Sequence, residues 1–359
     1  MDGTALVLTN GILHKPNAKT AHGLIRGSER FEILGLVDHV YAGQDAGEAL
    51  DGVHRDIPIF ETLDVALAAL PEQPKYFVIG IATHGGVLTD ELREHLYDAL
   101  SRGMSVVNGL HGFASDDPRL VEAAEKYGVS IIDVRKTPPR GELRFWHGAI
   151  YDVRAPRIAV LGTDCALGKR TTTRFLTEAL AARGIKAEMI YTGQTGWMQG
   201  SRYGFIFDSV PNDFVSGELE YAIVSCDREV APDVMLLEGQ SSLRNPAGPA
   251  GSEFLASGQA RGVVLQHAPG REHFEGYHDL PHAIIPSLAD ECRLVELYDS
   301  RVIGIAINGE GLDEAGTRAS RDRIQDELGI PTAAPLYDGM DILADAAVAF
   351  IEEERVRRS

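Results

Sequence analysis

The stretch from Val160 to Thr173 constrains this chain most, because it joins the end of a strand, a glycine-bounded loop and the start of a helix. An apolar run, Ile158 to Leu161, leads into the loop, and apolar residues at helical spacing follow it as far as Gly184. Backbone N–H groups of such a loop point into one concavity at a helix N-terminus, where the dipole favours an anion. Lys169 adds a full positive charge, so the stretch predicts a phosphate-binding site.

The spacing of this loop departs from the common P-loop in two places. Gly162 and Gly168 enclose five residues where the common motif has four, and Arg170 follows the lysine where the motif has Ser or Thr. Thr171 does not replace that hydroxyl, because one helical residue turns a side chain by about 100°. Arg170 either supplies fixed cationic charge or faces solvent. The alternative to phosphate binding is an ordinary glycine-rich turn.

Composition limits the classes of function that remain. At 359 residues, with 44% hydrophobic and 24% charged residues, the chain is long enough for two globular domains. The net charge of −19 argues against nucleic acid and against an anionic membrane surface, since both require a basic face. We expect a small-molecule substrate and a homo-oligomer.

The cysteines and the apolar runs indicate a cytoplasmic protein. Cys165, Cys226 and Cys292 are far apart and show no metal-ligand spacing, so we expect neither disulfides nor a metal site. No signal peptide is visible, and no apolar run approaches the roughly 20 residues that span a bilayer.

Residues 1–136 alternate between strand-like and helix-like segments, which predicts a Rossmann-like domain with a parallel sheet. The expected strands are Ala5 to Leu8, Phe31 to Val37, Tyr76 to Ile81, Ser105 to Val107 and Val129 to Val134. The expected helices are Thr62 to Leu70, Thr89 to Arg102 and Pro118 to Tyr127.

Two features of this half bear on ligands. Asp38 follows the second strand, where a dinucleotide-binding domain has its ribose acid, but the first turn has no GxGxxG, so we interpret Asp38 as a turn residue. Gly/His loops at residues 83–86 and 108–112 either line a small-molecule site or are tight turns.

Residues 137–156 are expected to link the domains, with one short strand at Leu143 to Trp146. Arg135, Lys136 and Arg140 flank or lie in this stretch. They either meet a carboxylate substrate or are solvated charges.

Residues 157–359 predict a second parallel-sheet domain, P-loop-like, with four polar positions after its strands. Gln194 lies in a loop after the strand Ala187 to Tyr191. Glu238 follows a buried strand and is a candidate metal ligand, base or lysine partner. His267 has an ordinary pKa near 6.5, suited to proton transfer, and Asn308 ends a later strand. Asn212 or Asp213 is expected to cap a helix.

These motifs resemble two groups of proteins. The sequence Gly-Thr-Asp-Cys-Ala-Leu-Gly-Lys, with the Gln-Thr-Gly, Glu-Gly and Ile-Asn that follow later strands, is similar to the dethiobiotin synthetase-like branch of the P-loop fold over residues 157–345. The whole chain, including Asp-Val-Arg-Lys-Thr-Pro-Pro at residues 133–139, resembles a family long described as of unknown function. Some of its members are D-glutamate N-acetyltransferases of the DgcN type.

The resemblance implies that the loop binds the phosphates of acetyl-CoA, since acyl transfer needs no magnesium. It implies a role for Asn308 in binding adenine and places Glu238 as an acidic residue facing the site. The implied phosphate-binding residues are Gly162, Thr163, Asp164, Gly168, Lys169, Arg170 and Thr171.

Transfer of an acetyl group to an α-amine needs a base, oxyanion donors and contacts to the substrate. Glu238 or His267 can accept the proton. Gln194 or Ser241 can stabilise the oxyanion, and Arg244, Arg135 or Arg140 can bind a substrate carboxylate. The main alternative is an ATP/Mg-dependent ligase or kinase acting on a small carboxylate, with Asp164, Thr171 and Glu238 holding magnesium. A nucleotide or CoA sensor and an NAD-dependent oxidoreductase are further alternatives.

Overall fold

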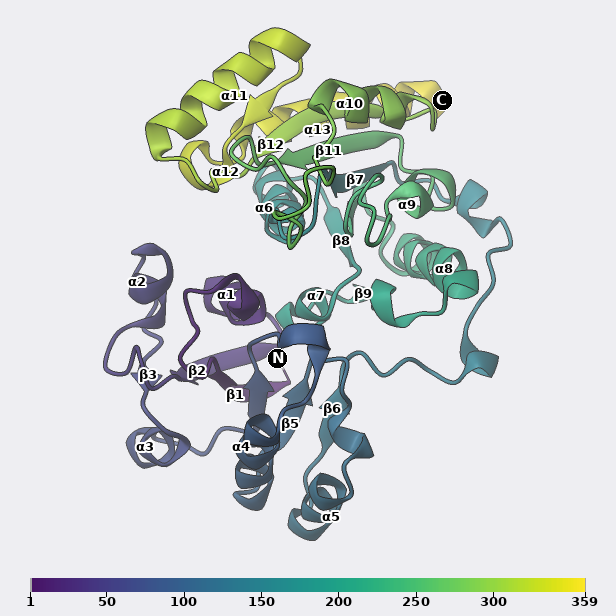
Figure 1. Ribbon diagram of the computed structural model, residues 1–359. Coiled ribbons are helices and arrows are strands. Elements are labelled where there is room, and N and C mark those ends of the chain that lie inside the picture. Colours follow the sequence, from purple (N-terminus) through teal and green to yellow (C-terminus); the bar gives the residue numbers. More distant parts are fainter. Residues whose placement is uncertain (1, 359) are drawn as a thin grey trace. The chain divides into compact units, whose positions relative to one another are not determined.

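A computed structural model describes residues 2–358 of the chain, which divide into two compact units (Figure 1). The first unit comprises Met1–Pro138 together with Gly193–Ser201, and the second comprises Pro139–Thr192 and Arg202–Ser359. The segment 193–201 lies within the range 157–359 that the sequence predicts for the second domain, yet it belongs to the first unit.

The first unit is built on a six-stranded parallel sheet of order β3-β2-β1-β4-β5-β6. Its chain alternates strands with helices, as the sequence predicts for a Rossmann-like domain. The strands are β1 (Gly3–Leu8), β2 (Phe31–Val37), β3 (Ile59–Phe60), β4 (Tyr76–Ile79), β5 (Ser105–Asn108) and β6 (Ile131–Asp133). The α-helices are α1 (Lys19–Arg26), α2 (Ala46–Asp51), α3 (Leu63–Ala69), α4 (Asp90–Ser101), α5 (Pro118–Tyr127) and α7 (Gln194–Gln199).

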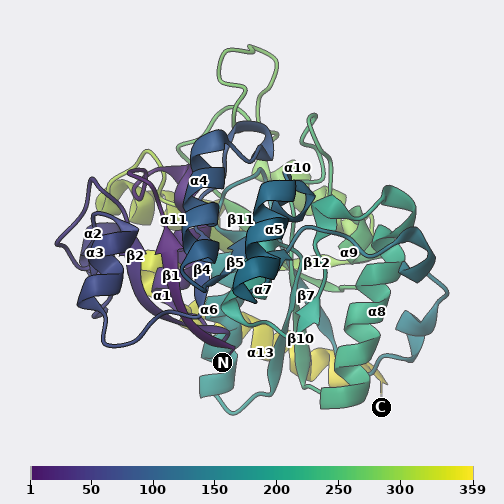
Figure 2. The same cartoon turned by 90° about the horizontal axis from the view of Figure 1, so that it is seen from below.

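Alternate side chains of β1 face the two sides of this sheet, which is why each side has its own core. Leu6 and Leu8 pack with apolar residues of α3, α4 and α5, and α4 and α5 lie side by side (Figure 2). Ala5 and Val7 pack on the other side with α1 and with Met198 of α7. The helix α7 therefore contributes to the core of the first unit, where Thr195 Oγ1 lies 3.0 Å from Thr20 Oγ1.

The second unit contains a seven-stranded parallel sheet of order β13-β12-β11-β7-β10-β8-β9. Its strands are β7 (Arg157–Gly162), β8 (Ala187–Tyr191), β9 (Tyr203–Gly204), β10 (Val234–Glu238), β11 (Gly262–His267), β12 (Arg301–Ile307) and β13 (Thr332–Ala333). Its α-helices are α6 (Lys169–Ala182), α8 (Asn212–Val230), α9 (Ser252–Ala256), α10 (Leu288–Glu296), α11 (Glu314–Leu328), α12 (Pro335–Asp338) and α13 (Asp341–Arg358).

The two faces of this second sheet are covered by different helices. Ile158 and Val160 of β7 pack with α6 and α13, whereas Ala159 and Leu161 pack with α8, α9 and α10. All six residues of β7 are buried, as a parallel sheet covered on both faces requires, and successive side chains point to opposite faces. Whether a residue of a strand has the same parity, odd or even number, as a neighbour in that strand therefore tells whether the two face the same layer of helices.

Three local expectations differ from the structure. Residues Leu143 to Trp146 form no strand, because the N–H of Arg144 bonds to Glu218 Oε1 at 2.9 Å instead of to a neighbouring strand. Residues 194–199 form α7 and not a loop. The cap of α8 is Pro211 without a side-chain hydrogen bond, so neither Asn212 nor Asp213 caps that helix.

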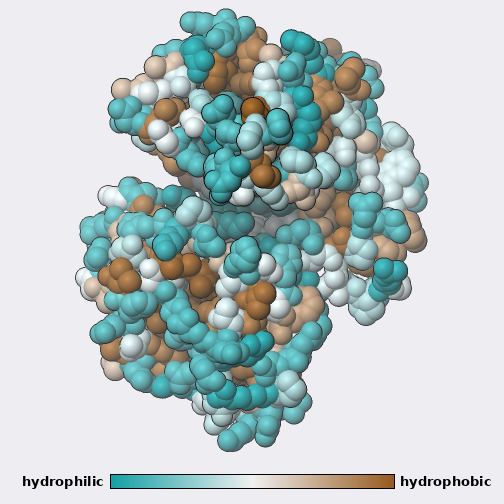
Figure 3. Space-filling model, viewed as in Figure 1, coloured by the Kyte–Doolittle hydropathy of each residue, from teal (hydrophilic) through white to brown (hydrophobic). Residues whose placement is uncertain are grey.

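The surface agrees with the strongly acidic composition. Hydrophilic side chains predominate on the face that Figure 3 shows, and hydrophobic side chains appear between them in small groups. Within residues 2–358, no helix combines the length and the apolar character that crossing a membrane would need.

Candidate phosphate-binding site

The loops that follow β7, β10, β11 and β12 meet at one edge of the second sheet. These four strands are parallel and pair in the order β12-β11-β7-β10, so their C-terminal ends lie side by side. This is the edge at which open parallel sheets bind ligands. The glycine-bounded loop follows β7 and leads directly into α6.

Two glycines shape the loop. Gly168 is the N-cap of α6 and has φ 96°, a left-handed conformation that glycine adopts without strain. A Cβ on Gly162 would lie 3.1 Å from Cδ and 3.2 Å from Nζ of Lys169, so the glycine lets the lysine fold back over the end of β7. The structure thus gives the strand, loop and helix that the sequence predicts.

The ammonium group of Lys169 lies inside the loop. Its Nζ donates to the carbonyl oxygen of Asp164 at 2.6 Å and to that of Ser241 at 2.8 Å, and the residue is buried. Lys169 therefore joins the loop after β7 to the loop after β10. A positive charge at this position and the N-terminus of the 14-residue helix α6 both favour an anion.

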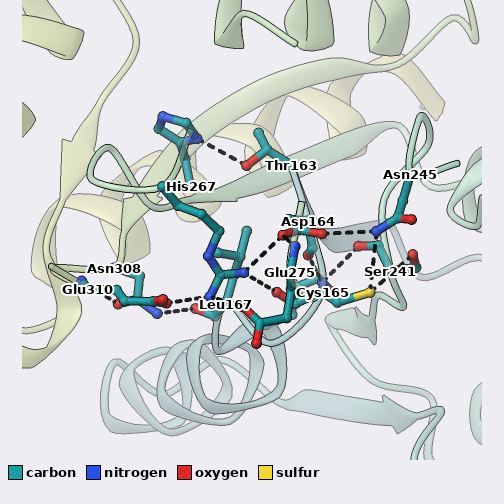
Figure 4. A network of polar contacts seen from close by, with 12 residues as sticks. Thr163, Asp164, Cys165, Leu167, Ser241, Asn245, His267, Glu275, Asn308 and Glu310 are labelled. Carbon is teal, nitrogen blue, oxygen red and sulfur yellow. Dashed lines mark hydrogen bonds and ion pairs between the residues drawn. The ribbon is translucent and has the colours of Figure 1, made fainter. Parts of the chain in front are cut away.

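Asp164 is fully buried and serves as a hub for three chain segments (Figure 4). Its Oδ1 accepts from Asn245 Nδ2 at 2.9 Å, in the loop after β10. Its Oδ2 accepts from Arg271 Nη1 at 3.0 Å and from the N–H of Glu275 at 2.7 Å, in the loop after β11. Because both oxygens are engaged, this carboxylate positions the loops.

Arg271 extends the same network toward β12. Its guanidinium also donates to the carbonyl oxygen of Cys165 at 2.8 Å and forms an ion pair with Glu310, which lies three residues after β12. The side chain is only 4% exposed, so its charge is compensated by carboxylates and not by water. The carboxylate of Asp164 and this arginine together join all four loops at the edge.

His267 lies at the end of β11, hydrogen-bonded through Nδ1 to Thr163 Oγ1 at 3.0 Å (Figure 4). It shares the parity of Val263 and Leu265, which face away from α6. Burial, together with the positive charge of Arg323, lowers the pKa of the imidazole to about 4. A neutral imidazole with so low a pKa is a weak proton acceptor at pH 7.

Glu238 ends β10 on the other face of the sheet, with the parity of Val234 and Leu236, which pack toward α6. The side chain is buried, and Oε2 accepts from the N–H of Thr192 at 2.9 Å. Gln266 shares this face, where its Oε1 accepts from Thr172 Oγ1 of α6 at 2.6 Å. Of the two candidate bases, Glu238 lies on the face of the sheet that is covered by α6, the helix that follows the phosphate loop.

The remaining residues expected at the phosphates and adenine lie close to the loop. Asn308 Nδ2 donates to the carbonyl oxygen of Leu167 at 3.0 Å, and its Oδ1 accepts from the N–H of Glu310 at 2.9 Å (Figure 4). This amide therefore braces the loop against the end of β12. Arg170 and Thr171 follow Lys169 in the first turn of α6 and are partly exposed.

The residues expected to bind the substrate, and Gln194, the expected oxyanion donor, are spread over both units. Ser241 and Arg244 lie in the loop after β10, beside the phosphate loop. Arg135 and Gln194 belong to the first unit, where Arg135 Nη2 donates to Gln194 Oε1 at 2.8 Å and its Nε donates to the carbonyl of Gly109 at 2.7 Å. Arg140 is exposed in a short 3-10 turn of the second unit.

The first unit carries its own features at the ends of its strands. Asp38 is a turn residue, as expected, because its oxygens accept from the N–H groups of Gly11, Val40 and Tyr41. The Gly/His loops line a cavity of about 540 Å³. Its lining includes Gly85, Gly86, His111 and Gly112.

Sequence analysis did not identify Arg271, Asn245 or Glu291 as residues of this edge. Arg271 lies only four residues beyond His267, in a loop that the sequence already places at the edge. Asn245 follows Arg244 in the loop after β10, and Glu291 lies on α10. For Arg271 and Asn245, the sequence feature that could have identified them is their position shortly after the C-terminal end of a strand.

The fold and the edge define a class: a two-domain α/β protein whose second sheet carries a P-loop-type site. Comparison with known proteins agrees. Residues 144–344 match the P-loop domain of unknown function DUF1611, and residues 40–137 match its Rossmann-like N-terminal domain. The chain belongs to the DUF1611 family.

Two relatives of this chain carry the same name. A protein of Tritonibacter scottomollicae named D-glutamate N-acetyltransferase is 33% identical over 296 residues, covering 80% of this chain and 84% of the relative. A protein of Pseudoalteromonas sp. with the same name is 31% identical over 280 residues, covering 74% and 79%. A crystal structure of a DUF1611 family protein from Anabaena variabilis aligns with TM-score 0.87 and 32% identity, over 97% of this chain and 99% of that one. The shared name of the relatives supports an N-acetyltransferase.

Proposed function

We propose that this protein transfers an acetyl group from acetyl-CoA to the amine of a small amino acid, and that the acceptor is D-glutamate. The observation that carries the proposal is the glycine-bounded loop at the start of α6, with Lys169 inside it and Arg170 where a magnesium-binding hydroxyl would stand. The name shared by relatives at 31% and 33% identity supports the reaction and the acceptor.

Coenzyme A fits this loop better than a magnesium nucleotide does. Its diphosphate needs N–H groups and fixed positive charge, which the start of α6 and Lys169 supply. A magnesium site built on Asp164 would have to displace Asn245, Arg271 or the N–H of Glu275, since these groups occupy both carboxylate oxygens. Acyl transfer from a thioester needs no magnesium ion.

In the proposed reaction, the acceptor amine attacks the thioester carbonyl. A C–N bond forms, the C–S bond breaks, and the proton lost by the nitrogen passes to a base while the departing thiolate is protonated. Glu238 is the proposed base, because it is buried at the end of β10 on the face of the sheet that α6 covers. Backbone N–H groups at the edge and Ser241 are the proposed donors to the tetrahedral oxyanion.

Calorimetric titration with acetyl-CoA, ATP and NAD in parallel tests the ligand. We expect micromolar acetyl-CoA binding without magnesium, weakened at least tenfold, or about 1.4 kcal/mol, in Lys169→Ala. Lys186→Ala, which removes an exposed lysine of the same unit, is the matched control. Magnesium-dependent binding of ATP, with no binding of acetyl-CoA, would contradict the proposal.

Turnover is tested by thiol release from acetyl-CoA with D-glutamate in the presence of a chelator. Glu238→Gln should lower kcat by a factor of about 100 or more if Glu238 is the base. Glu188→Gln, on β8 of the same sheet, is the control. Magnesium-dependent ADP release with a carboxylate would instead indicate a ligase or kinase, and binding without turnover would indicate a sensor.

A further inference from the structure

The loop after β10 is fixed to the phosphate loop at two points. At one, the Ser241 carbonyl accepts from Lys169 Nζ at 2.8 Å. At the other, Asn245 Nδ2 donates to Asp164 Oδ1 at 2.9 Å, and Figure 4 shows Ser241 and Asn245 both beside the sulfur of Cys165. Arg244 immediately precedes Asn245, so its backbone lies beside the phosphate loop.

One edge of the Arg244 guanidinium is anchored in the protein. Its Nε donates to Glu291 Oε1 at 2.6 Å, where Glu291 lies in the first turn of α10. The Glu291 side chain is 1% exposed, whereas that of Arg244 is 35% exposed. Burial raises the pKa of Glu291, although the guanidinium beside it acts in the opposite direction. Glu291 therefore fixes the direction of an arginine that also reaches solvent.

Three buried side-chain atoms in the loop after β10 and on α10 have no hydrogen-bond partner within the described part of the chain. They are Ser242 Oγ, Arg244 Nη2 and Glu291 Oε2. Buried polar groups are almost always paired, because each unpaired one costs about 1–3 kcal/mol. Arg244 Nη2 is a hydrogen-bond donor, and an anionic acceptor group is the kind of partner that satisfies it.

The other arginines considered for the substrate are less suited. Arg135 uses Nε and Nη2 within the first unit, for the Gly109 carbonyl and for Gln194. Arg140 is exposed. Arg271 is committed to Asp164, Cys165 and Glu310. Arg271 also has a buried unpaired atom, Nε, but its side chain is only 4% exposed. Arg244 alone among these four combines an anchored edge and a buried unpaired N–H group with a side chain that is 35% exposed beside the phosphate loop.

We propose that Arg244, oriented by Glu291, binds a carboxylate of the amino-acid acceptor. The inference rests on the proposed function, because it assigns the acceptor subsite of that reaction. A guanidinium suits a carboxylate because its planar N–H groups match the two oxygens. Glu291 acts through Arg244 and is a positioning residue.

The test compares Arg244→Gln with the wild-type protein in steady-state kinetics. The KM for D-glutamate should rise at least tenfold, while the KM for acetyl-CoA stays within twofold. Glu291→Gln should raise the KM for D-glutamate by a smaller factor with little change in kcat. Arg293→Gln is the matched control, because Arg293 lies on the same helix with 73% exposure and pairs with Asp290.

A second set of variants separates binding from folding. Removing Arg244 leaves Glu291 buried without its partner, so thermal unfolding is measured for each variant, and the double variant Arg244→Gln/Glu291→Gln removes both charges. Arg244→Lys keeps the charge and loses the planar fork. We expect the double variant and Arg244→Lys to retain the fold and to show the raised KM for D-glutamate.

Calorimetry with glutarate, a dicarboxylate without an amine, reports the subsite without turnover. Glutarate should bind the wild type and lose at least tenfold in affinity in Arg244→Gln. Absence of glutarate binding in the wild type, or an unchanged KM for D-glutamate in a folded Arg244→Gln, would overturn the inference. A wild type that binds glutarate through Arg244 but releases no thiol from acetyl-CoA would overturn the proposed function alone.

Discussion

Arg271 and Asp164 form an ion pair in the interior of the second unit, with Nη1 3.0 Å from Oδ2 and side-chain exposures of 4% and 0%. Each residue has further partners, so the pair joins the loops after β7, β10, β11 and β12. Asp164 is the second residue between Gly162 and Gly168, so its neutralised carboxylate fixes the phosphate loop through contacts within the protein. This arrangement lowers the ordering cost of binding.

Asp164→Asn should destabilise the second unit by about 3 kcal/mol, because it leaves Arg271 buried with less compensating charge. Chemical denaturation measures the change. Asp279→Asn, at an exposed position in the same loop as Arg271, should change the free energy of unfolding by less than about 0.5 kcal/mol. Equal stability of the two variants would contradict the role of Asp164 as a buried hub.

Gly168→Ala should cost about 1–2 kcal/mol, because φ 96° is strained for a residue with a Cβ. The added methyl meets nothing within 4 Å, so the loss reports backbone strain and not a clash. Gly141→Ala is the control, since its Cβ is also unobstructed and its φ is not in the left-handed region. Thermal unfolding measures the stability of both variants. Equal stability of Gly168→Ala and Gly141→Ala would mean that the loop relaxes and that φ at Gly168 imposes no strain.

Protonation of His267 should make stability depend on pH. Burial lowers the folded-state pKa from 6.5 to about 4, so the unfolded chain binds more protons between these pH values. Stability therefore falls as the pH drops from about 6.5 toward 4, by up to about 3 kcal/mol. The slope of the unfolding free energy against pH measures this contribution, and His267→Gln should remove it.

The exposed His278 provides the comparison for this pH dependence. His278→Gln should leave the slope between pH 4 and 6.5 as it is in the wild type. A slope that persists in His267→Gln would mean that other groups carry the pH dependence.

The sequence predicts most strands of both sheets because their apolar runs are bounded by glycine, proline and charged residues. The predicted ranges Phe31 to Val37 and Ala187 to Tyr191 are those of β2 and β8. Residues 192–197 were interpreted as a loop because their glycine and polar side chains give little helical periodicity, whereas residues 194–199 form α7. Their helix is stabilised by packing within the first unit, as in the contact of Thr195 with Thr20, 175 residues away.

The candidate site was predictable only in part. Local spacing indicates the roles of Gly162, Gly168 and Lys169, since the phosphate loop is formed by consecutive residues. The role of Asp164 depends on Arg271 and Glu275, which are 107 and 111 residues away and meet it only after the sheet has formed. Spacing carries no information on such partners.

The connection between the sheets offers a last prediction, because the segment after Pro139 is fixed to α8 by buried carboxylates. Glu220 Oε2 accepts from the N–H of His147 at 2.9 Å, and its Oε1 accepts from the N–H groups of Gly148 at 2.9 Å and Ile150 at 3.1 Å. The side chain is 2% exposed. This stretch is therefore part of the second unit and not a flexible linker.

Glu220→Gln should release this segment, because the amide N–H₂ faces backbone N–H groups and leaves at least one of them unpaired. We expect a loss of about 1–3 kcal/mol and faster amide hydrogen exchange at residues 147–150. Asp213→Asn, at an exposed position in the first turn of the same helix, should cost no more than about 1 kcal/mol and leave that exchange unchanged. Unaltered exchange at residues 147–150 in Glu220→Gln would show that apolar packing of Ile150, which is fully buried, holds the segment without the carboxylate.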